Sequence, residues 1–279
     1  MENKEFTRLT PNYRRPAVAG QFYPAEPENL TRSIREFLDP PREHLHALGV
    51  VVPHAGYMYS GHVAGAVYAR VEVPQRNIVL CPNHTGLGTP LSIMKSGTWQ
   101  TPLGDMQIDA ELCEALMNAD PYLEDDASAH RFEHALEVQL PFMQHLGGAS
   151  VRFAPITIGT SSLDRLQELG RAISQVIREI ENDTLIIASS DMNHYESDAI
   201  TRVKDRKAID QILAMDPQGL YDVVRGENIS MCGYGPAVAM LTAAKQLGAT
   251  RVELVKYATS GDVSLDFDHV VGYAGMVVV

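Results

Sequence analysis

The stretch GVVVPHAGYMYSGHVAGAVYAR, residues 49–70, shows the pattern that decides the fold. Its first part, 49–56, is a short apolar run rich in valine, which predicts a buried strand that ends in a loop carrying His54. A helical pattern follows at 60–70. A strand, a loop and a helix in this order are the repeating unit of an α/β fold.

The same alternation recurs along the whole chain. Further apolar runs that predict buried strands lie at 77–86, 151–159, 184–194, 251–261 and 270–279. Helical patterns lie at 26–38, 109–118, 132–146, 161–181, 198–215 and 234–247. We therefore expect an α/β fold with a mainly parallel or mixed central sheet flanked by helices.

One segment, residues 90–109, breaks this rhythm. Its alternating pattern and its SG and LGD turns predict a β-hairpin extension in place of a crossover helix. No linker rich in Pro, Gly or Ser divides the chain, and no internal repeat is visible. The sequence therefore predicts a single domain with one embellishment.

Composition limits the classes of partner. The net charge is −12, and no cluster of Lys and Arg is dense enough to follow a phosphate backbone, so we expect no nucleic acid. The first residues lack the apolar stretch of a signal peptide, and no apolar run reaches the roughly 18 residues that a membrane span needs. Three scattered cysteines fit a reducing compartment. These observations predict a cytoplasmic protein that is not inserted in a membrane.

Three predicted strands end in loops that carry histidine. His54 follows the first of these strands, His84 the second, and Asp191 with His194 the third. The carboxyl ends of parallel strands meet at one edge of a sheet, where ligands bind. A lone histidine there is more often structural, but three together indicate a shared site. The loops PHAGYMYSG (53–61) and PNHTGLGTP (82–90) contain glycines, but neither matches a phosphate-binding motif.

Cys232 differs in context from the other two cysteines. It lies just before a predicted helix with Pro236 near its start, where we expect the thiolate to be favoured. Cys81 lies in an apolar strand run and Cys113 in a helical one, as packing residues do. Two imidazoles and one thiolate would suit Cu, Zn or Fe(II) and would leave positions open for substrate or water.

The segment HRFEHALEVQLPFMQHL, residues 130–146, adds a second group of candidates. On a helix, His134 and Glu137 would share one face and could hold a metal. We favour a supporting role for this group behind the ligands, in which Glu133 or Glu137 orients or caps a neighbouring element. Leu136, Leu140 and Phe142 would fill the core.

Six motifs in order resemble those of the Memo family, of the AmmeMemoRadiSam system protein B type. They are AGQFYPA (19–25), PHAGYMYSG (53–61), PNHTG (82–86), EHALEVQLPF (133–142), SSDMNHY (189–195) and CGYGP (232–236). The resemblance runs from about residue 15 onward. It implies a Memo-like domain over 15–279 after an N-terminal extension at 1–14.

The Memo family is similar in fold to the class III extradiol dioxygenases, which open catechol rings with non-haem Fe(II) and O₂. Carried over by motif, the resemblance implies metal ligation by His54, His84 and Cys232, with Asp191 and His194 beside them. We expect His194 to act as a general acid/base that Asp191 orients. The thiolate departs from the two histidines and one carboxylate of the ring-opening enzymes, so iron(II) and copper both stay open as the metal.

The motif AGQFYPA bears on the ligand. Some family members have Trp where this chain has Phe22, and we expect Phe22 and Tyr23 to form an aromatic wall that contacts substrate. The resemblance thus predicts a dioxygenase-like oxidoreductase with a small-molecule or peptide ligand in the central cleft. Two alternatives are a non-catalytic module that binds a peptide or metabolite in the same cleft, and a metal-handling partner in a larger assembly.

Overall fold

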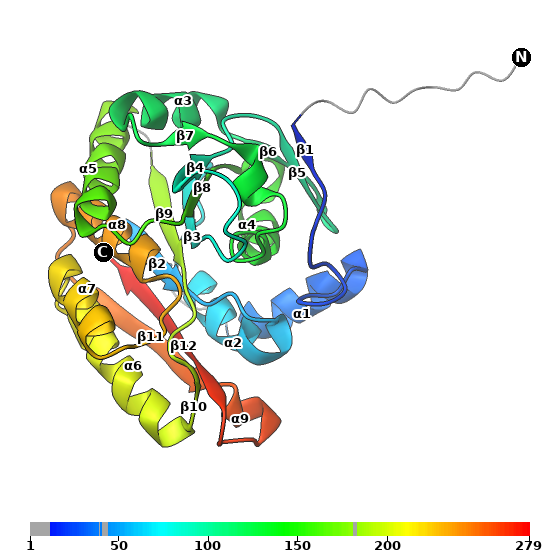
Figure 1. Ribbon diagram of the computed structural model, residues 1–279. Coiled ribbons are helices and arrows are strands. Elements are labelled where there is room, and N and C mark those ends of the chain that lie inside the picture. The colour runs from blue at the N-terminus through cyan, green and yellow to red at the C-terminus, as the bar shows by residue number, and fades with distance from the viewer. Residues whose placement is uncertain (1–11, 39, 41–43, 181–182) are drawn as a thin grey trace, which may run out of the picture.

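The computed structural model describes residues 12–38, 40, 44–180 and 183–279 (Figure 1). The strands are β1 (Tyr13–Arg14), β2 (Gly49–Val52), β3 (Arg76–Pro82), β4 (Leu91–Ile93), β5 (Thr98–Thr101), β6 (Gly104–Ile108), β7 (Glu124–Asp125), β8 (Arg152–Ile158), β9 (Thr184–Ser189), β10 (His194–Glu196), β11 (Val252–Thr259) and β12 (Val270–Val278). The helices are α1 (Pro27–Leu38), α2 (Tyr57–Tyr68), α3 (Ala110–Ala119), α4 (Leu140–Gly147), α5 (Leu163–Ile180), α6 (Asp198–Leu213), α7 (Pro217–Gly226), α8 (Tyr234–Leu247) and α9 (Gly261–Ser264).

The strands form one mixed sheet. Its main path runs β1-β5-β6-β8-β3-β9-β2-β12-β10, while β11 pairs with β12, and β4 pairs with β7 and β8. The central strands β8, β3, β9 and β2 are parallel, whereas β12 is antiparallel to β2. This arrangement confirms the α/β fold with a mixed central sheet in a single domain.

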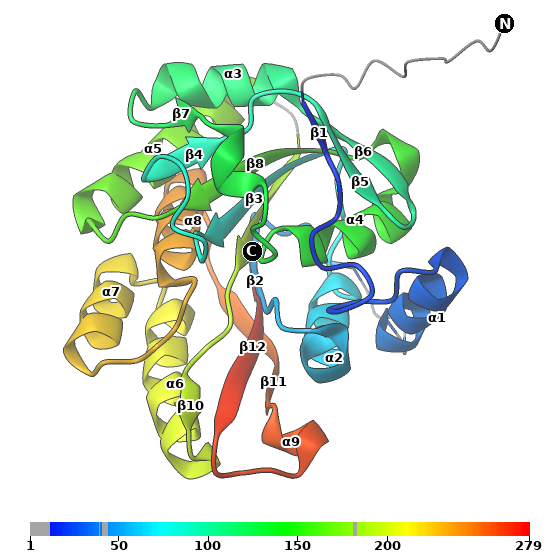
Figure 2. The ribbon, with the colours of Figure 1, turned by 45° about the vertical axis from the view of Figure 1, so that its right-hand side comes forward.

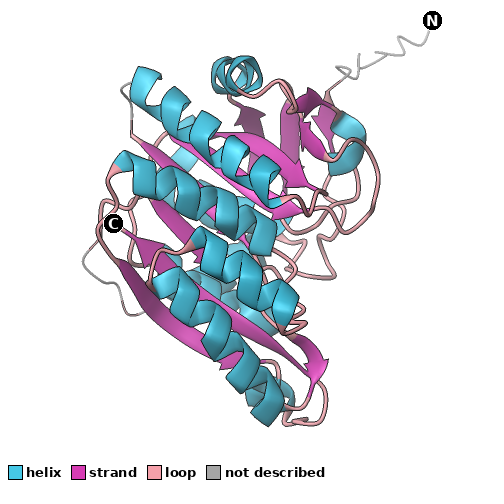
Figure 3. Cartoon of the chain, turned by 60° about the vertical axis from the view of Figure 1, so that its left-hand side comes forward, coloured by secondary structure: helices cyan, strands magenta, loops and turns pink. Residues whose placement is uncertain are grey.

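Helices cover both faces of the sheet. On one face α5 packs against α8, α8 against α7, and α7 against α6. Figure 3 shows these helices side by side in a row that covers the sheet. On the other face α2 packs against β2, β11 and β12, and α1 lies against α2 and α4 (Figures 1 and 2). A parallel strand covered on both faces needs apolar side chains on both sides, which explains the continuous valine and isoleucine runs.

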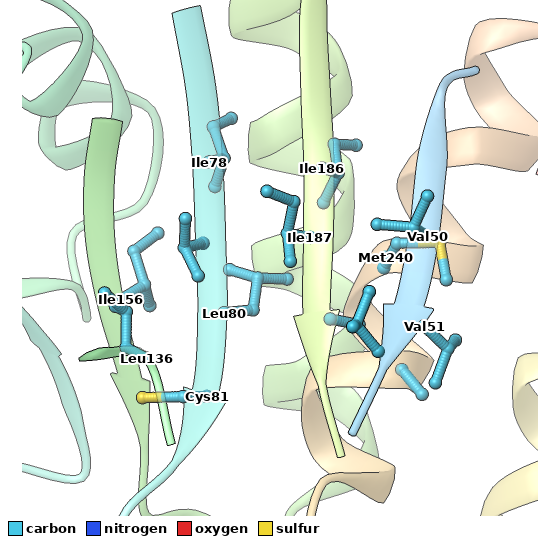
Figure 4. Close-up of a cluster of buried hydrophobic side chains, with 14 of the residues drawn as sticks. Val50, Val51, Ile78, Leu80, Cys81, Leu136, Ile156, Ile186, Ile187 and Met240 are labelled. Carbon is cyan, nitrogen blue, oxygen red and sulfur yellow. The ribbon is translucent and has the colours of Figure 1, made fainter. Parts of the chain in front are cut away.

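The core lies along the central strands (Figure 4). Val50 of β2, Ile78 of β3 and Ile187 of β9 are fully buried, and Met240 of α8 packs down onto this layer. Gly49 at the start of β2 leaves room for that contact, because a Cβ there would lie 2.6 Å from the Met240 sulfur and the side chain would have to shift. The core therefore fixes the relative positions of the strands whose ends carry the histidines.

Each of the six predicted strands is present, with its carboxyl end shortened wherever a functional loop begins. The expected hairpin at 90–109 contains the antiparallel pair β5 and β6. The helix expected at 132–146 is wrong in its first half, because α4 begins only at Leu140, next to Pro141, after a 3₁₀ turn at Glu137–Gln139. Helix α7 was not predicted, although Asp216 caps it and Pro217 opens it.

The chain start is tied into the sheet. Tyr13 and Arg14 of β1 pair with β5, just before the domain boundary expected at residue 15, and the rest of the expected extension, 1–11, lies outside the described residues. Among the residues that the structure describes, no helix is both long and apolar enough to cross a membrane.

Candidate metal centre

Three loops at the carboxyl edge of the sheet bring the predicted ligands together. His54 follows β2 and His84 follows β3, and β9 lies between these two strands. Cys232 reaches the same place from the chain just before α8. One donor atom from each of these three residues lies within 4.8 Å of the other two. Side chains far apart in the sequence thus form one compact group of two imidazoles and a thiol.

The hydrogen bonds around His54 decide which of its nitrogens can bind a metal. Its Nδ1 lies 3.0 Å from the hydroxyl oxygen of Ser189. That hydroxyl donates its only proton to the carbonyl of Ala135 and accepts from the side-chain amide of Gln139. His54 must therefore be the donor at Nδ1, which makes Nε2 the acceptor nitrogen that faces the Cys232 thiol. Burial and the neighbouring histidines hold the pKa of His54 well below its usual range, so the ring is neutral.

His84 is oriented by a buried carboxylate. Its Nδ1 lies 2.9 Å from Oε1 of Glu133, and its backbone N–H donates to Oε2 of the same residue. Burial alone would raise the pKa of Glu133, but the hydrogen bonds from His84 and the backbone hold it below its usual value. Burial alone would lower the pKa of His84, but the hydrogen bond and the charge of Glu133 raise it. In the neutral ring the ionised Glu133 accepts the Nδ1 proton, so the lone pair is on Nε2.

The Cys232 thiol lies 3.3 Å from Nε2 of His54. The expectation that its thiolate is favoured by the start of α8 is wrong for the metal-free protein. Burial raises the pKa of Cys232, and the nearby carboxyl of Asp191 adds to the rise. Desolvation disfavours the anion, and a bound cation would supply the missing positive charge.

Asp191 and His194 have different partners from those expected. The Asp191 carboxylate accepts the backbone N–H groups of His54 and Ala55, and burial raises its pKa to about 7. Nδ1 of His194 lies 2.9 Å from the carbonyl oxygen of Ser230, which can only accept. Ser230, and not Asp191, therefore fixes the tautomer of His194 with the lone pair on Nε2. Burial lowers the pKa of His194, so the ring is neutral near pH 7.

His134 lies beside the ligands but not on the expected helix. Its ring stacks on that of His84 with centroids 4.8 Å apart, and its Nδ1 is 3.4 Å from Glu133. His84, Glu133 and His134 form a second group with donor atoms within 4.8 Å, but its Glu133 oxygen already accepts the proton of His84. His134 thus lies beside the three candidate ligands and contacts His84 and Glu133.

Glu137 holds the segment 14–23 in place. It is fully buried, and it accepts hydrogen bonds from Arg14, from the backbone N–H groups of Ala17 and Val18, and from the Tyr23 hydroxyl. His134 precedes the 3₁₀ turn at Glu137–Gln139 and is not on a helix, and the carboxylate of Glu137 is already taken up by the segment 14–23. Glu133 bonds to His84, in a loop far away in the sequence.

The two aromatic residues expected to contact substrate lie in different surroundings. The Phe22 ring meets the His134 ring edge to face with centroids 4.8 Å apart. Tyr23 is buried, and its hydroxyl donates to Glu137. A cavity of about 210 Å³ lies beside His84 and Cys232, and the residues that line it include Asn83, Thr160, Ser161 and Tyr234 but neither Phe22 nor Tyr23. Tyr23 supports the loop, and substrate contact by Phe22 stays a prediction.

Sequence reasoning missed several residues that orient the site: Ser189, Gln139 and Ser230. Each lies within or next to a motif that had been noted, but the partner of each lies far away in the chain, so periodicity and spacing carried no signal for these bonds.

Comparison with known proteins agrees with these motifs. A sequence model described as Memo-like protein matches residues 14–277. A MEMO1 family protein of Methanopyrus kandleri is 46% identical over 277 residues, covering 95% of this chain and 98% of the relative. Another, from Methanosarcina mazei, is 44% identical over 267 residues, covering 95% and 98%. The solved structure of an uncharacterized Escherichia coli K12 protein shares the fold, with a TM-score of 0.58 and 13% identity over 82% of this chain and 98% of that one. The chain therefore belongs to the Memo family.

Proposed function

We propose that this protein is a non-haem metal-dependent oxidoreductase of the dioxygenase-like kind, in which His54, His84 and Cys232 hold one Fe(II) or copper ion. The single observation that carries the proposal is the convergence of the three donor atoms within 4.8 Å. The bond from each Nδ1 to a fixed acceptor adds to it, because both Nε2 lone pairs are left for a cation.

The donor set fits such an ion. Two neutral imidazoles and one thiolate form a moderately soft set that suits copper and Fe(II). When bound, the ion would supply one-electron chemistry toward O₂ or an organic substrate. Glu133 and Ser189 keep the two rings in the tautomer that ligation needs, and burial of His54 excludes water from its side of the site.

His194 is the proposed proton carrier. Its neutral ring has an acceptor nitrogen at Nε2, because Nδ1 is held by the Ser230 carbonyl. A residue of this kind takes up a proton from a substrate hydroxyl or returns one to a product. The cavity of about 210 Å³ beside His84 and Cys232 favours a small molecule over a peptide as its occupant.

The test is metal analysis of protein purified without oxygen. Wild type should hold about one Fe(II) or copper ion per chain, and Cys232→Ser or His84→Ala should lose most of it. Cys113→Ser is the matched cysteine control, since Cys113 is buried far from the group, and it should keep the ion. His194→Ala should also keep the ion while losing about a hundredfold in any oxidative turnover.

Two results would contradict the proposal. If folded Cys232→Ser and His84→Ala bound metal as tightly as wild type, the ligand assignment would be wrong. If His194→Ala emptied the site, His194 would be a ligand and Cys232 would need another role.

A further inference from the structure

Exposed apolar side chains gather at one end of the molecule. Ten large hydrophobic residues are exposed among those that the structure describes, and six of them lie in two short segments, 195–203 and 263–267. The six are Tyr195, Ile200, Val203, Val263, Leu265 and Phe267. We call them the α9 end, because α9, β10 and the first turns of α6 meet there (Figures 1 and 2).

The two segments are fixed to each other. The backbone N–H of Asp198 donates to the carbonyl of Phe267 at 2.9 Å, and Arg202 lies 3.0 Å from Asp262. The apolar side chains therefore project from a built surface formed by two parts of the chain. Six large apolar side chains exposed at one end of the molecule indicate a site that binds a partner.

Two of these side chains are held outward by an unfavourable backbone. Leu265 is 78% exposed with φ of 61°, and Tyr195 is 73% exposed with φ of 62°. Leu265 occupies the left-handed position that ends α9, where Gly or Asn is usual. A bulky residue in this conformation destabilises the fold, and such outliers concentrate at functional sites. The two most exposed large apolar side chains thus stand at positions where they do not stabilise the fold.

Charge narrows the kind of partner. Segments 194–204 and 260–269 hold five acidic residues against two basic ones, a net of −3. Both bases are engaged, Arg202 with Asp198 and Asp262, and Lys204 with Glu196. Among the described residues, Asp266 and Asp268 have no ion-pair partner, and they flank Phe267 on an exposed loop.

A second copy of this chain would bring the same negative charge to the contact, and the whole chain carries −12. An anionic lipid surface would be repelled for the same reason. We propose that the α9 end docks a positively charged polypeptide segment that carries apolar side chains. This surface begins one residue after His194, so the docked segment would lie next to the proposed proton carrier, but the proposal does not depend on metal binding.

The probe is a short fluorescent peptide that alternates lysine and leucine, with a lysine and serine peptide of equal charge as the comparison. Wild type should bind the first more tightly than the second, with an affinity that falls as salt is added. Leu265→Asn should weaken binding by about tenfold or more, because one buried leucine contact is lost. Asp266→Asn with Asp268→Asn should weaken it and reduce its salt dependence. The control Tyr122→Asn changes an exposed aromatic residue outside the α9 end and should bind as wild type does.

Stability separates docking from a structural role. Asn tolerates the left-handed conformation, so Leu265→Asn should unfold at an equal or higher urea concentration than wild type while losing the peptide. The proposal is overturned if Leu265→Asn keeps full affinity or if both peptides bind equally well. A lower urea midpoint for Leu265→Asn, or a wild-type dimer in sedimentation that this variant abolishes, also overturns it, since the side chain would then serve folding or self-association.

Discussion

Ser189 has a single hydroxyl proton, and the direction in which it is donated determines what His54 can bind. Because the proton goes to the Ala135 carbonyl, His54 has to donate from Nδ1 and presents Nε2 as an acceptor. The same logic applies to His84 through Glu133, and to His194 through the Ser230 carbonyl. Three histidines thus share one tautomer, imposed by three chemically different acceptors.

Replacing Ser189 tests whether its hydroxyl group sets the tautomer of His54. Ser189→Ala leaves Nδ1 of His54 without its acceptor, so the tautomer is no longer fixed, and metal affinity should fall about 10- to 100-fold. Competition with a chelator of known affinity measures the loss. The control is Ser174→Ala, which removes a different buried serine, on α5, and should bind metal as wild type does. Equal affinity in the two variants would show that the hydroxyl does not orient the ligand.

The three cysteines should differ in reactivity because they differ in exposure to solvent. Cys81 and Cys113 are fully buried, whereas Cys232 is partly exposed, although burial also raises its thiol pKa. Limiting alkylation of the metal-free protein should therefore label Cys232 first but slowly, and added metal should protect it. Peptide mapping by mass spectrometry reads out the order. First labelling at Cys81 or Cys113 would contradict the assignment.

At the scale of elements, one carboxyl group joins α6 to two neighbours. Asp205 of α6 accepts the backbone N–H of Asn193 and the hydroxyl of Tyr257 on β11. Gly272 of β12 passes so close that a Cβ there would meet the carboxylate at 1.8 Å. Burial raises the pKa of Asp205 to about 7, even though Tyr257, the backbone and Arg202 lower it.

This carboxyl should make stability depend on pH. The native state binds the proton more tightly than the unfolded chain, so the free energy of unfolding should fall as pH rises from about 4 to about 7, and then level off. Asp205→Asn removes this contribution. Relative to the variant, wild type should lose about 2 to 3 kcal/mol between pH 5 and pH 8, measured by urea unfolding. A difference between the two proteins that stays constant over that range would rule out Asp205 as the cause.

For the whole molecule, the sequence predicted the layers well but not the long-range hydrogen bonds. The buried runs at 49–56 and 184–194 were found because strands covered on both faces are apolar throughout. The helix expected at 132–146 begins only at Leu140, next to Pro141, and the bond between Glu133 and His84 is one that no periodicity records. The placement of β9 between β2 and β3 also had to come from the structure, and it is this order that brings His54 and His84 together.

The position of β12 has a consequence for biosynthesis. This strand pairs with β2, β10 and β11, so residues 270–278 join strands that come from widely separated parts of the chain. Until β12 has been made, β2 lacks one neighbour and the valine-rich strands stay partly uncovered. A nascent chain also contains no complete ligand set until Cys232 has been added. A partly made chain that lacks β12 would therefore expose apolar strands to chaperones, and one that lacks Cys232 would also lack the complete group of candidate ligands.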